Sequence, residues 1–277
     1  MRHQSILEYA HFRWLKAALG LSILAGAAYL WHDPPMKPYG GTWLGYALGT
    51  AGALIILWLL WFGVRKRSYL SRAGTVQGWL SAHVYLGTAL LVVATLHTGF
   101  ELGWNLHTLA YVLMVATVAS GFYGVYIYLS VPGLMTANRG EETLDAMLLK
   151  IADLDREIRE QALSLPDRIL VVVNASLDGT RLGGSLARVV TGRDRGCPTA
   201  AALRALPEIG KTLSGEAANL HHEVYTLLLR KSELLARARR DLRFKARLDL
   251  WLYAHVPLSI ALLAALAAHV VSVFLYW

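Results

Sequence analysis

Two stretches of sequence, HVYLGTALLVVATLH at residues 83–97 and HVPLSIALLAALAAH at residues 255–269, decide the fold. Both are uncharged and mostly apolar, and each begins and ends with a histidine fourteen residues from the other. On an α-helix, fourteen steps return to within about 40° of the starting direction and advance about 21 Å. Each stretch therefore predicts a membrane-spanning helix that presents two imidazoles on one face, near opposite surfaces of a bilayer.

The placement of charge supports a membrane protein. The chain has 277 residues, 55% of them hydrophobic, and a net charge of +8. Between Ala73 and Thr136 the only acidic or basic residue is Glu101, and none occurs from Leu250 to Trp277. Stretches without charged residues are expected where a charge would be buried in hydrocarbon. A basic surface for nucleic acid would not require it, so we expect lipid contact and no nucleic-acid partner.

Five stretches are long enough to cross a bilayer core of about 30 Å, which needs roughly 20 apolar residues. They are residues 14–31, 43–64, 78–100, 106–129 and 250–276. The first could be read as a secretory signal, but no small-x-small cleavage site ends it, so we interpret it as a retained anchor. The predicted fold class is all-α, a membrane bundle of five transmembrane helices with a cytoplasmic, mostly helical insertion between spans four and five.

Basic clusters orient the spans, because cytoplasmic flanks are enriched in Lys and Arg. The clusters precede span one, join spans two and three, and precede span five: Arg2, Arg13 and Lys16; Arg65, Lys66, Arg67 and Arg72; Arg237, Arg239, Arg240, Arg243, Lys245 and Arg247. They predict a cytoplasmic N-terminus and an external C-terminus, and we expect a bacterial inner membrane. The predicted division is 1–137 for spans one to four, 138–249 for the insertion and 250–277 for span five.

The insertion carries two helical seams of apolar residues. The first comprises Leu144, Met147, Ile151, Leu154 and Ile158, and the second comprises Leu220, Val224, Leu227, Leu234 and Ala238, interrupted by Lys231. Together they predict an antiparallel helical hairpin whose second helix continues into span five. Between the seams, residues 168–174 (RILVVVN) suggest a short strand, and residues 178–184 a Gly-rich loop. The hairpin is either a docking or oligomerisation element or a spacer.

Spans three and five both begin on the cytoplasmic side and so run parallel. We therefore expect His83 to face His255 at an inner level and His97 to face His269 at an outer level. Gly87 lies one turn from His83, where a missing side chain would leave room for a flat macrocycle. The single cysteine, Cys197, excludes a four-cysteine iron–sulfur site and the covalent C-x-x-C-H haem site. The alternative is that these histidines form interhelical hydrogen bonds or relay protons.

This arrangement resembles the dihaem b-type membrane cytochromes, in which two transmembrane helices each carry H-x13-H or a near variant. It is similar to cytochrome b of quinol:cytochrome c oxidoreductases and, more closely in layout, to the transmembrane core of ferric reductases and NADPH oxidases. The resemblance implies that His83, His97, His255 and His269 are the axial ligands of two non-covalent b-type haems. It covers the membrane part alone. A sixth span and a flavin or nicotinamide domain are not found in the sequence, so we expect electrons to enter from quinol or another subunit.

Other polar residues are weaker candidates. Glu101 and His107, with Tyr111 and Asn105 as secondary members, could form an outer quinone site, or could be loop residues in water. One or two basic residues near the inner boundary could pair with haem propionates, although topology also explains them; these are Arg65, Lys66, Arg67, Arg72 and Arg247. His221 and His222 point in different directions on a helix, which disfavours a shared metal.

The resulting functional expectation is an electron-transfer subunit of an oxidoreductase complex. It would pass electrons between the quinone pool and a redox partner subunit, either an iron–sulfur protein or a c-type cytochrome. Because both axial positions at each iron are filled, no position is open to a substrate, and the haems would only transfer electrons. The alternative is a haem-free transporter or assembly factor that uses its intramembrane histidines for proton or metal transfer.

Overall fold

The described part of the chain folds into helices and the turns that join them. The computed structural model describes residues 5–34, 38–68, 74–140, 142–192 and 196–275. It is 85% helical, and the described residues contain no strand, which confirms the predicted all-α class. The chain forms two compact units, one of residues 1–126 with 251–277 and the other of residues 127–250. The predicted limits at residues 137 and 249, drawn from apolar composition, stay a prediction.

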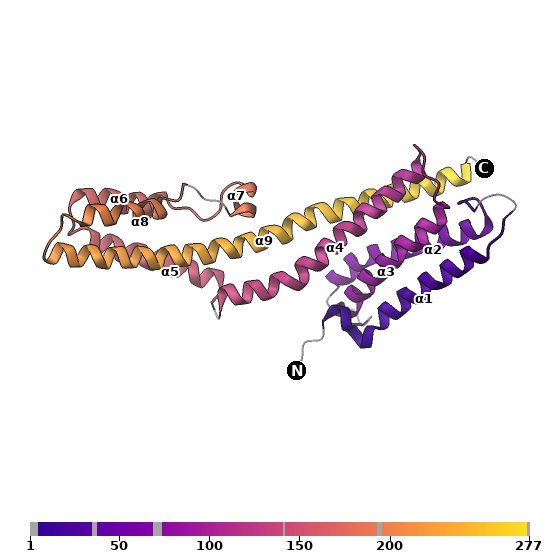
Figure 1. Cartoon of the computed structure of the whole chain (residues 1–277), viewed down its shortest axis with the longest axis horizontal. Helices are drawn as coiled ribbons and strands as arrows, with labels where there is room; N and C mark the ends of the chain where they lie inside the picture. Colours follow the sequence, from indigo (N-terminus) through magenta and orange to yellow (C-terminus); the bar gives the residue numbers. More distant parts are fainter. Residues whose placement is uncertain (1–4, 35–37, 69–73, 141, 193–195, 276–277) are drawn as a thin grey trace. The chain divides into compact units, whose positions relative to one another are not determined.

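Among the described residues, five helices are long and apolar enough to cross a membrane. They are α1 (Tyr9–Trp31), α2 (Trp43–Arg67), α3 (Val76–Thr98), α4 (Leu106–Arg139) and α9 (Glu216–Leu275). Each matches one of the predicted spans, although α3 ends two residues before the predicted residue 100, and residue 276 lies outside the described residues, so the chain is an integral membrane protein. Helix α9 continues unbroken from the insertion into span five, as the seam predicted (Figure 1).

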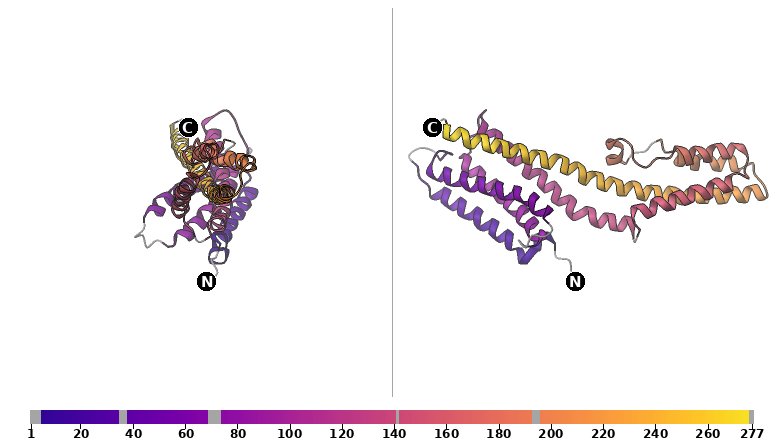
Figure 2. Two further views of the ribbon diagram at one scale, coloured as in Figure 1. Left: turned by 90° about the vertical axis from the view of Figure 1, so that its left-hand side faces the viewer. Right: turned by 180° about the vertical axis from the view of Figure 1, so that it is seen from behind.

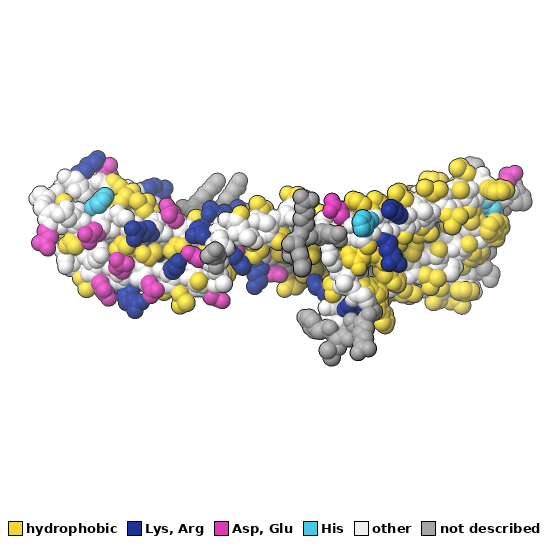
Figure 3. All heavy atoms as spheres, turned by 90° about the horizontal axis from the view of Figure 1, so that it is seen from below, with side chains coloured by type: hydrophobic (Ala, Val, Ile, Leu, Met, Phe, Trp, Pro, Cys, Tyr) yellow, Lys and Arg dark blue, Asp and Glu magenta, His cyan; other side chains and the backbone are white. Residues whose placement is uncertain are grey.

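In the first unit, α1, α2 and α3 pack side by side (Figures 1 and 2). Their starts are set by threonine caps: the Thr42 hydroxyl accepts from the Gly45 N–H of α2, and Thr75 accepts from the Gly78 N–H of α3. Helix α3 ends at Gly99, which has a φ of +60°. The face of this unit in Figure 3 is dominated by hydrophobic side chains, as lipid contact requires.

The second unit is a helical hairpin with additional helices. Helix α5 (Leu144–Ala162) pairs with the first part of α9, and Asp155 of α5 meets Lys231 while Glu142, just before α5, meets Arg237, so the pair is antiparallel. The predicted seams are confirmed, because Met147, Ile158 and Val224 are fully buried. Helices α6 (Asp167–Gly179), α7 (Leu186–Thr191) and α8 (Pro198–Gly210) complete the unit, and α6 packs on α8.

The predicted strand at residues 168–174 is wrong, because this segment lies inside helix α6. Ile169, Val173 and Leu177 are buried and recur at four-residue intervals, while Val171 is 68% exposed. The segment therefore buries one helical face against the hairpin core. Packing of that face outweighs the strand preference of three successive valines, which is only a weak bias.

Lys231, which interrupts the second seam, is buried with 1% of its surface exposed. Its ammonium lies 2.6 Å from Asp155 Oδ1 and donates to the Ser176 carbonyl of α6 at 3.2 Å. Lys231 is therefore part of the core and links α5, α6 and α9. A buried ammonium needs such partners, because leaving it unpaired would be strongly unfavourable.

The helical face of α6 gives a direct test of the correction. Ile169→Ala should lower the free energy of opening α6 by about 3 kcal/mol, because it leaves a cavity in the core. Val171→Ala should change it by less than about 0.5 kcal/mol, because that side chain is exposed. Hydrogen exchange of the α6 amides in the detergent-purified full chain measures both. Equal losses at the two positions would indicate strand-like alternation and contradict the helix.

Candidate functional site

The structure brings the four membrane histidines together in two pairs. The ring centroids of His83 and His255 lie 6.5 Å apart, and those of His97 and His269 lie 6.1 Å apart. All four side chains are half-buried, two of them on α3 and two on α9. These are the pairs that the fourteen-residue spacing and the parallel direction of the two helices predict.

A leucine layer separates the two histidine levels. Leu90 stands seven residues from both His83 and His97, and Leu262 stands seven residues from both His255 and His269. Both leucines are buried in one hydrophobic cluster, at 1% and 5% exposure. Helices α3 and α9 are thus in register at three levels, each roughly 10 Å from the next. The apolar middle layer keeps water away from the space between the two imidazole pairs.

His97 is fixed by α2. Its Nδ1 lies 2.7 Å from the Gly45 carbonyl, which can only accept, so Nδ1 carries the proton and Nε2 has a free lone pair. The ring lies against Gly49, where an added Cβ would come within 2.7 Å of the imidazole Cε1. The absence of a side chain at Gly49 therefore makes room for this imidazole.

His255 is fixed by α4. Its Nδ1 lies 2.7 Å from the Ser120 hydroxyl, and that hydroxyl donates to the Thr117 carbonyl at 2.7 Å. The Trp251 indole, one turn before His255, donates to the Ser120 carbonyl at 2.8 Å. Trp251 lies so close to Gly124 that a Cβ there would overlap the ring. A small, polar face of α4 thus receives both aromatic side chains of α9.

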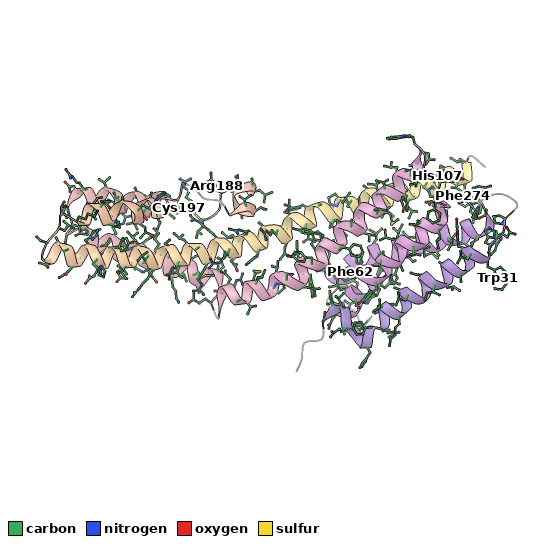
Figure 4. All side chains as sticks on the ribbon, in the orientation of Figure 1. Trp31, Phe62, His107, Arg188, Cys197 and Phe274 are labelled. Carbon is green, nitrogen blue, oxygen red and sulfur yellow. The ribbon has the colours of Figure 1, made fainter. Side chains whose placement is uncertain are left out.

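His107, which the sequence suggested only as a member of a quinone site, contacts His269 of the outer pair. Its Nδ1 lies 2.5 Å from Nδ1 of His269, and the two ring centroids are 4.5 Å apart. Figure 4 labels His107 at the start of α4. Its position at the outer end of a span was the available signal, but only the contact between α4 and α9 reveals the partner. Glu101 is exposed in the preceding loop.

The secondary candidates have local partners. The Tyr111 hydroxyl lies 3.0 Å from that of Thr95, so it links α4 to α3. The Asn105 side chain accepts from the Thr108 N–H and caps the start of α4.

His83 is the least supported of the four histidines. Its buried Nδ1 makes no hydrogen bond of ordinary length and angle among the described residues, although the Leu59 backbone of α2 lies near the ring. The ring lies 5.2 Å from that of Phe62 on α2, which is labelled in Figure 4. A buried polar nitrogen without a partner costs free energy, so its presence here suits a group that would bind the ring.

The spacing of the pairs fits a metal held between two imidazoles. Metal–nitrogen bonds of about 2 Å, with about 1.1 Å more to each ring centre, place the centroids roughly 6 Å apart. Within the part of the chain that the structure describes, no group of three or more His, Cys, Asp or Glu side chains is placed to hold a metal ion. Two facing imidazoles at each level would suit a group that brings its own equatorial nitrogens, as haem does.

The remaining predicted residues occupy other surroundings. Gly87 is buried and faces α2, where an added Cβ would lie 3.9 Å from Leu59, and its contact with a macrocycle stays a prediction. Arg65 is buried and donates to the carbonyls of Ser68 and Gly74, so it holds the chain after α2. Lys66, Arg67 and Arg247 are exposed, and Arg72 lies outside the described residues.

Histidines of the insertion take no part in this site. His221 Nε2 lies 3.0 Å from the Leu206 carbonyl, and the ring packs against Gly210. His222 is exposed. The two rings therefore diverge, as the helical spacing predicts.

Comparisons with known proteins identify no relative: no family model, curated protein or solved structure matches this chain. The geometry of the histidine pairs and the sequence pattern are therefore the basis for function.

The close contact between Gly49 and the His97 imidazole predicts that a side chain at position 49 affects only the outer histidine pair. Gly49→Ala should displace the His97 imidazole, break its bond to the Gly45 carbonyl and lower the amount of any haem bound at the outer level. Gly63→Ala is the matched control, because an added Cβ there meets nothing within 4 Å on the same helix. Haem per chain, measured by pyridine haemochrome, should fall by about half in the first variant. Unchanged content would contradict a role for His97.

Proposed function

We propose that this chain is a membrane electron-transfer cytochrome that holds two b-type haems between α3 and α9. His83 and His255 would ligate the inner haem, and His97 and His269 the outer one. The observation that carries the proposal is the pair of imidazole separations, 6.5 and 6.1 Å, at two matched heights on parallel helices. Chance placement of intramembrane histidines does not require equal spacing on both helices.

The chain's own residues provide the setting that electron transfer needs. Bis-histidine haem supplies one-electron redox chemistry and leaves no iron position for substrate. The hydrogen bond to Gly45 leaves Nε2 of His97 free to ligate, and the contact with Ser120 allows the same for His255. Leu90 and Leu262 form an apolar layer between the two levels, which limits solvent access.

The proposed partners follow from the position of the two haem levels. One level would exchange electrons with the quinone pool, and the other with an iron–sulfur or c-type cytochrome subunit. With the basic clusters facing the cytoplasm, the N-terminus would lie inside and the C-terminus outside, in a bacterial inner membrane. The chain would then serve as the electron-transfer subunit of an oxidoreductase complex.

An outer quinone site is part of the proposal. Oxidation of a quinol to a quinone releases two electrons and two protons, so the site needs a proton acceptor beside its electron acceptor. Glu101 in the exposed loop would accept the proton, and His107, which contacts His269, would place the site beside the outer haem.

A haem-free transporter or assembly factor remains the second candidate. The observation that favours it is a row of three imidazoles at the outer end. His269 Nδ1 lies 2.5 Å from His107 Nδ1, and the His269 ring centroid lies 6.1 Å from that of His97. Such a chain could pass protons. It predicts a colourless purified protein.

The reduced-minus-oxidised spectrum of the purified protein tests the proposal. We expect a b-type spectrum and two haems per chain by pyridine haemochrome. His→Ala at position 83, 97, 255 or 269 should each remove about one haem, because one axial bond is lost. His221→Ala, outside the bundle, is the control and should keep both. Material without Soret absorption would contradict the proposal and favour the haem-free candidate.

The same preparation tests the quinone part. A quinol added alone should reduce both haems when electrons enter from the quinone pool. Full reduction of the haems by dithionite without any reduction by quinol would instead indicate another electron donor. The quinone site at Glu101 and His107 would then be withdrawn.

A further inference from the structure

Helix α4 carries no proposed ligand, yet it contacts both ligands of α9. Ser120 lies 2.7 Å from His255 Nδ1, and His107 lies 2.5 Å from His269 Nδ1. The two α4 residues are thirteen positions apart, about 20 Å along the axis, and the two α9 histidines are fourteen apart, about 21 Å. The early residue of α4 meets the late histidine of α9, so this part of the two helices runs antiparallel with matched spacing.

Ser120 has one hydroxyl proton and two neighbours. The Thr117 carbonyl accepts only, and it lies 2.7 Å from the hydroxyl oxygen. When the proton is donated there, the hydroxyl oxygen accepts from Nδ1–H of His255. That tautomer leaves the lone pair on Nε2, where a metal bond can form.

His107 offers His269 a stronger acceptor. Two neutral imidazole nitrogens can share one hydrogen bond only when one ring donates and the other accepts. With His269 donating from Nδ1, its Nε2 is free to ligate, and the basic nitrogen of His107 draws the proton. Hydrogen bonding of this kind raises the basicity of a ligating imidazole. A more basic ligand stabilises ferric over ferrous iron.

We propose that Ser120 and His107 are positioning residues that fix the ligating tautomers of His255 and His269, and that His107 lowers the reduction potential of the outer haem. This inference rests on the proposed function. It assigns to α4 the control of both haems, one through a hydroxyl and the other through an imidazole. At the outer level His97 is also held, by the Gly45 carbonyl, whereas His83 Nδ1 at the inner level makes no hydrogen bond of ordinary geometry in the described part of the chain.

The test uses variants of the full-length protein with each haem observed separately. The His83→Ala background leaves the outer haem, and the His97→Ala background leaves the inner one. Into both backgrounds, and into the two-haem protein, His107→Leu, His107→Gln and Ser120→Ala are introduced. Val115→Ala, an exposed position on the same helix, is the control. Redox titration at one fixed pH gives the midpoint potentials, and electron paramagnetic resonance of the ferric form reports the ligand geometry.

We expect His107→Leu to keep the outer haem and to increase its equilibrium constant for reduction at least threefold, which is about 30 mV for one electron. The inner haem should not change. His107→Gln, which retains an acceptor, should lie closer to the unsubstituted protein. Ser120→Ala should shift the potential and the resonance spectrum of the inner haem alone.

Two results would overturn the inference while leaving the proposed function intact. Haem retained with unchanged potentials in His107→Leu and Ser120→Ala would remove the tuning role. Loss of the outer haem in both His107 variants would make His107 a ligand and not a positioning residue. Absence of haem from the unsubstituted protein would contradict the proposed function itself.

Discussion

The register between helices α3 and α9 is the constraint on which the rest of the site depends. Imidazole, leucine and imidazole recur at seven-residue steps on both helices, and the helices run parallel, so like side chains meet at three heights. A shift of one residue on either helix would turn its histidines by about 100° and separate the pairs. Two levels of paired imidazoles therefore follow from one alignment, and neither level can be adjusted without the other.

The neighbouring helices α2 and α4 provide the hydrogen bonds that orient these imidazoles. In a membrane interior, an imidazole nitrogen finds no water, so its partners must come from the protein. Gly45 on α2 supplies a carbonyl to His97, and on α4 the Ser120 hydroxyl and the His107 imidazole hydrogen-bond to His255 and His269. Small residues make these approaches possible, as at Gly49 and Gly124. The imidazoles of α3 and α9 are thus oriented by the neighbouring helices α2 and α4.

Features that repeat along one helix could be predicted from the sequence, and features that depend on contacts between helices could not. The five spans follow from uncharged apolar length, and the histidine pairs follow from equal spacing. The role of His107 requires knowing that α4 lies against the end of α9, which no local pattern states. The strand prediction failed at residues 168–174, because three valines favour a strand locally while Ile169 and Val173 bury a helical face. Lys231 broke the seam in sequence, yet its pairing with Asp155 keeps it inside the core.

The most direct test of the account is a comparison of paired substitutions at the four histidines. If α3 and α9 hold the haems in the proposed register, the His83→Ala/His255→Ala and His97→Ala/His269→Ala proteins each lose both ligands of one haem and should retain the other. The His83→Ala/His269→Ala protein loses one ligand of each haem and should retain none. Haem counted per chain in these three proteins gives the answer. Equal haem in all three, or retention of one haem in the crossed variant, would contradict the pairing and with it the proposed electron path.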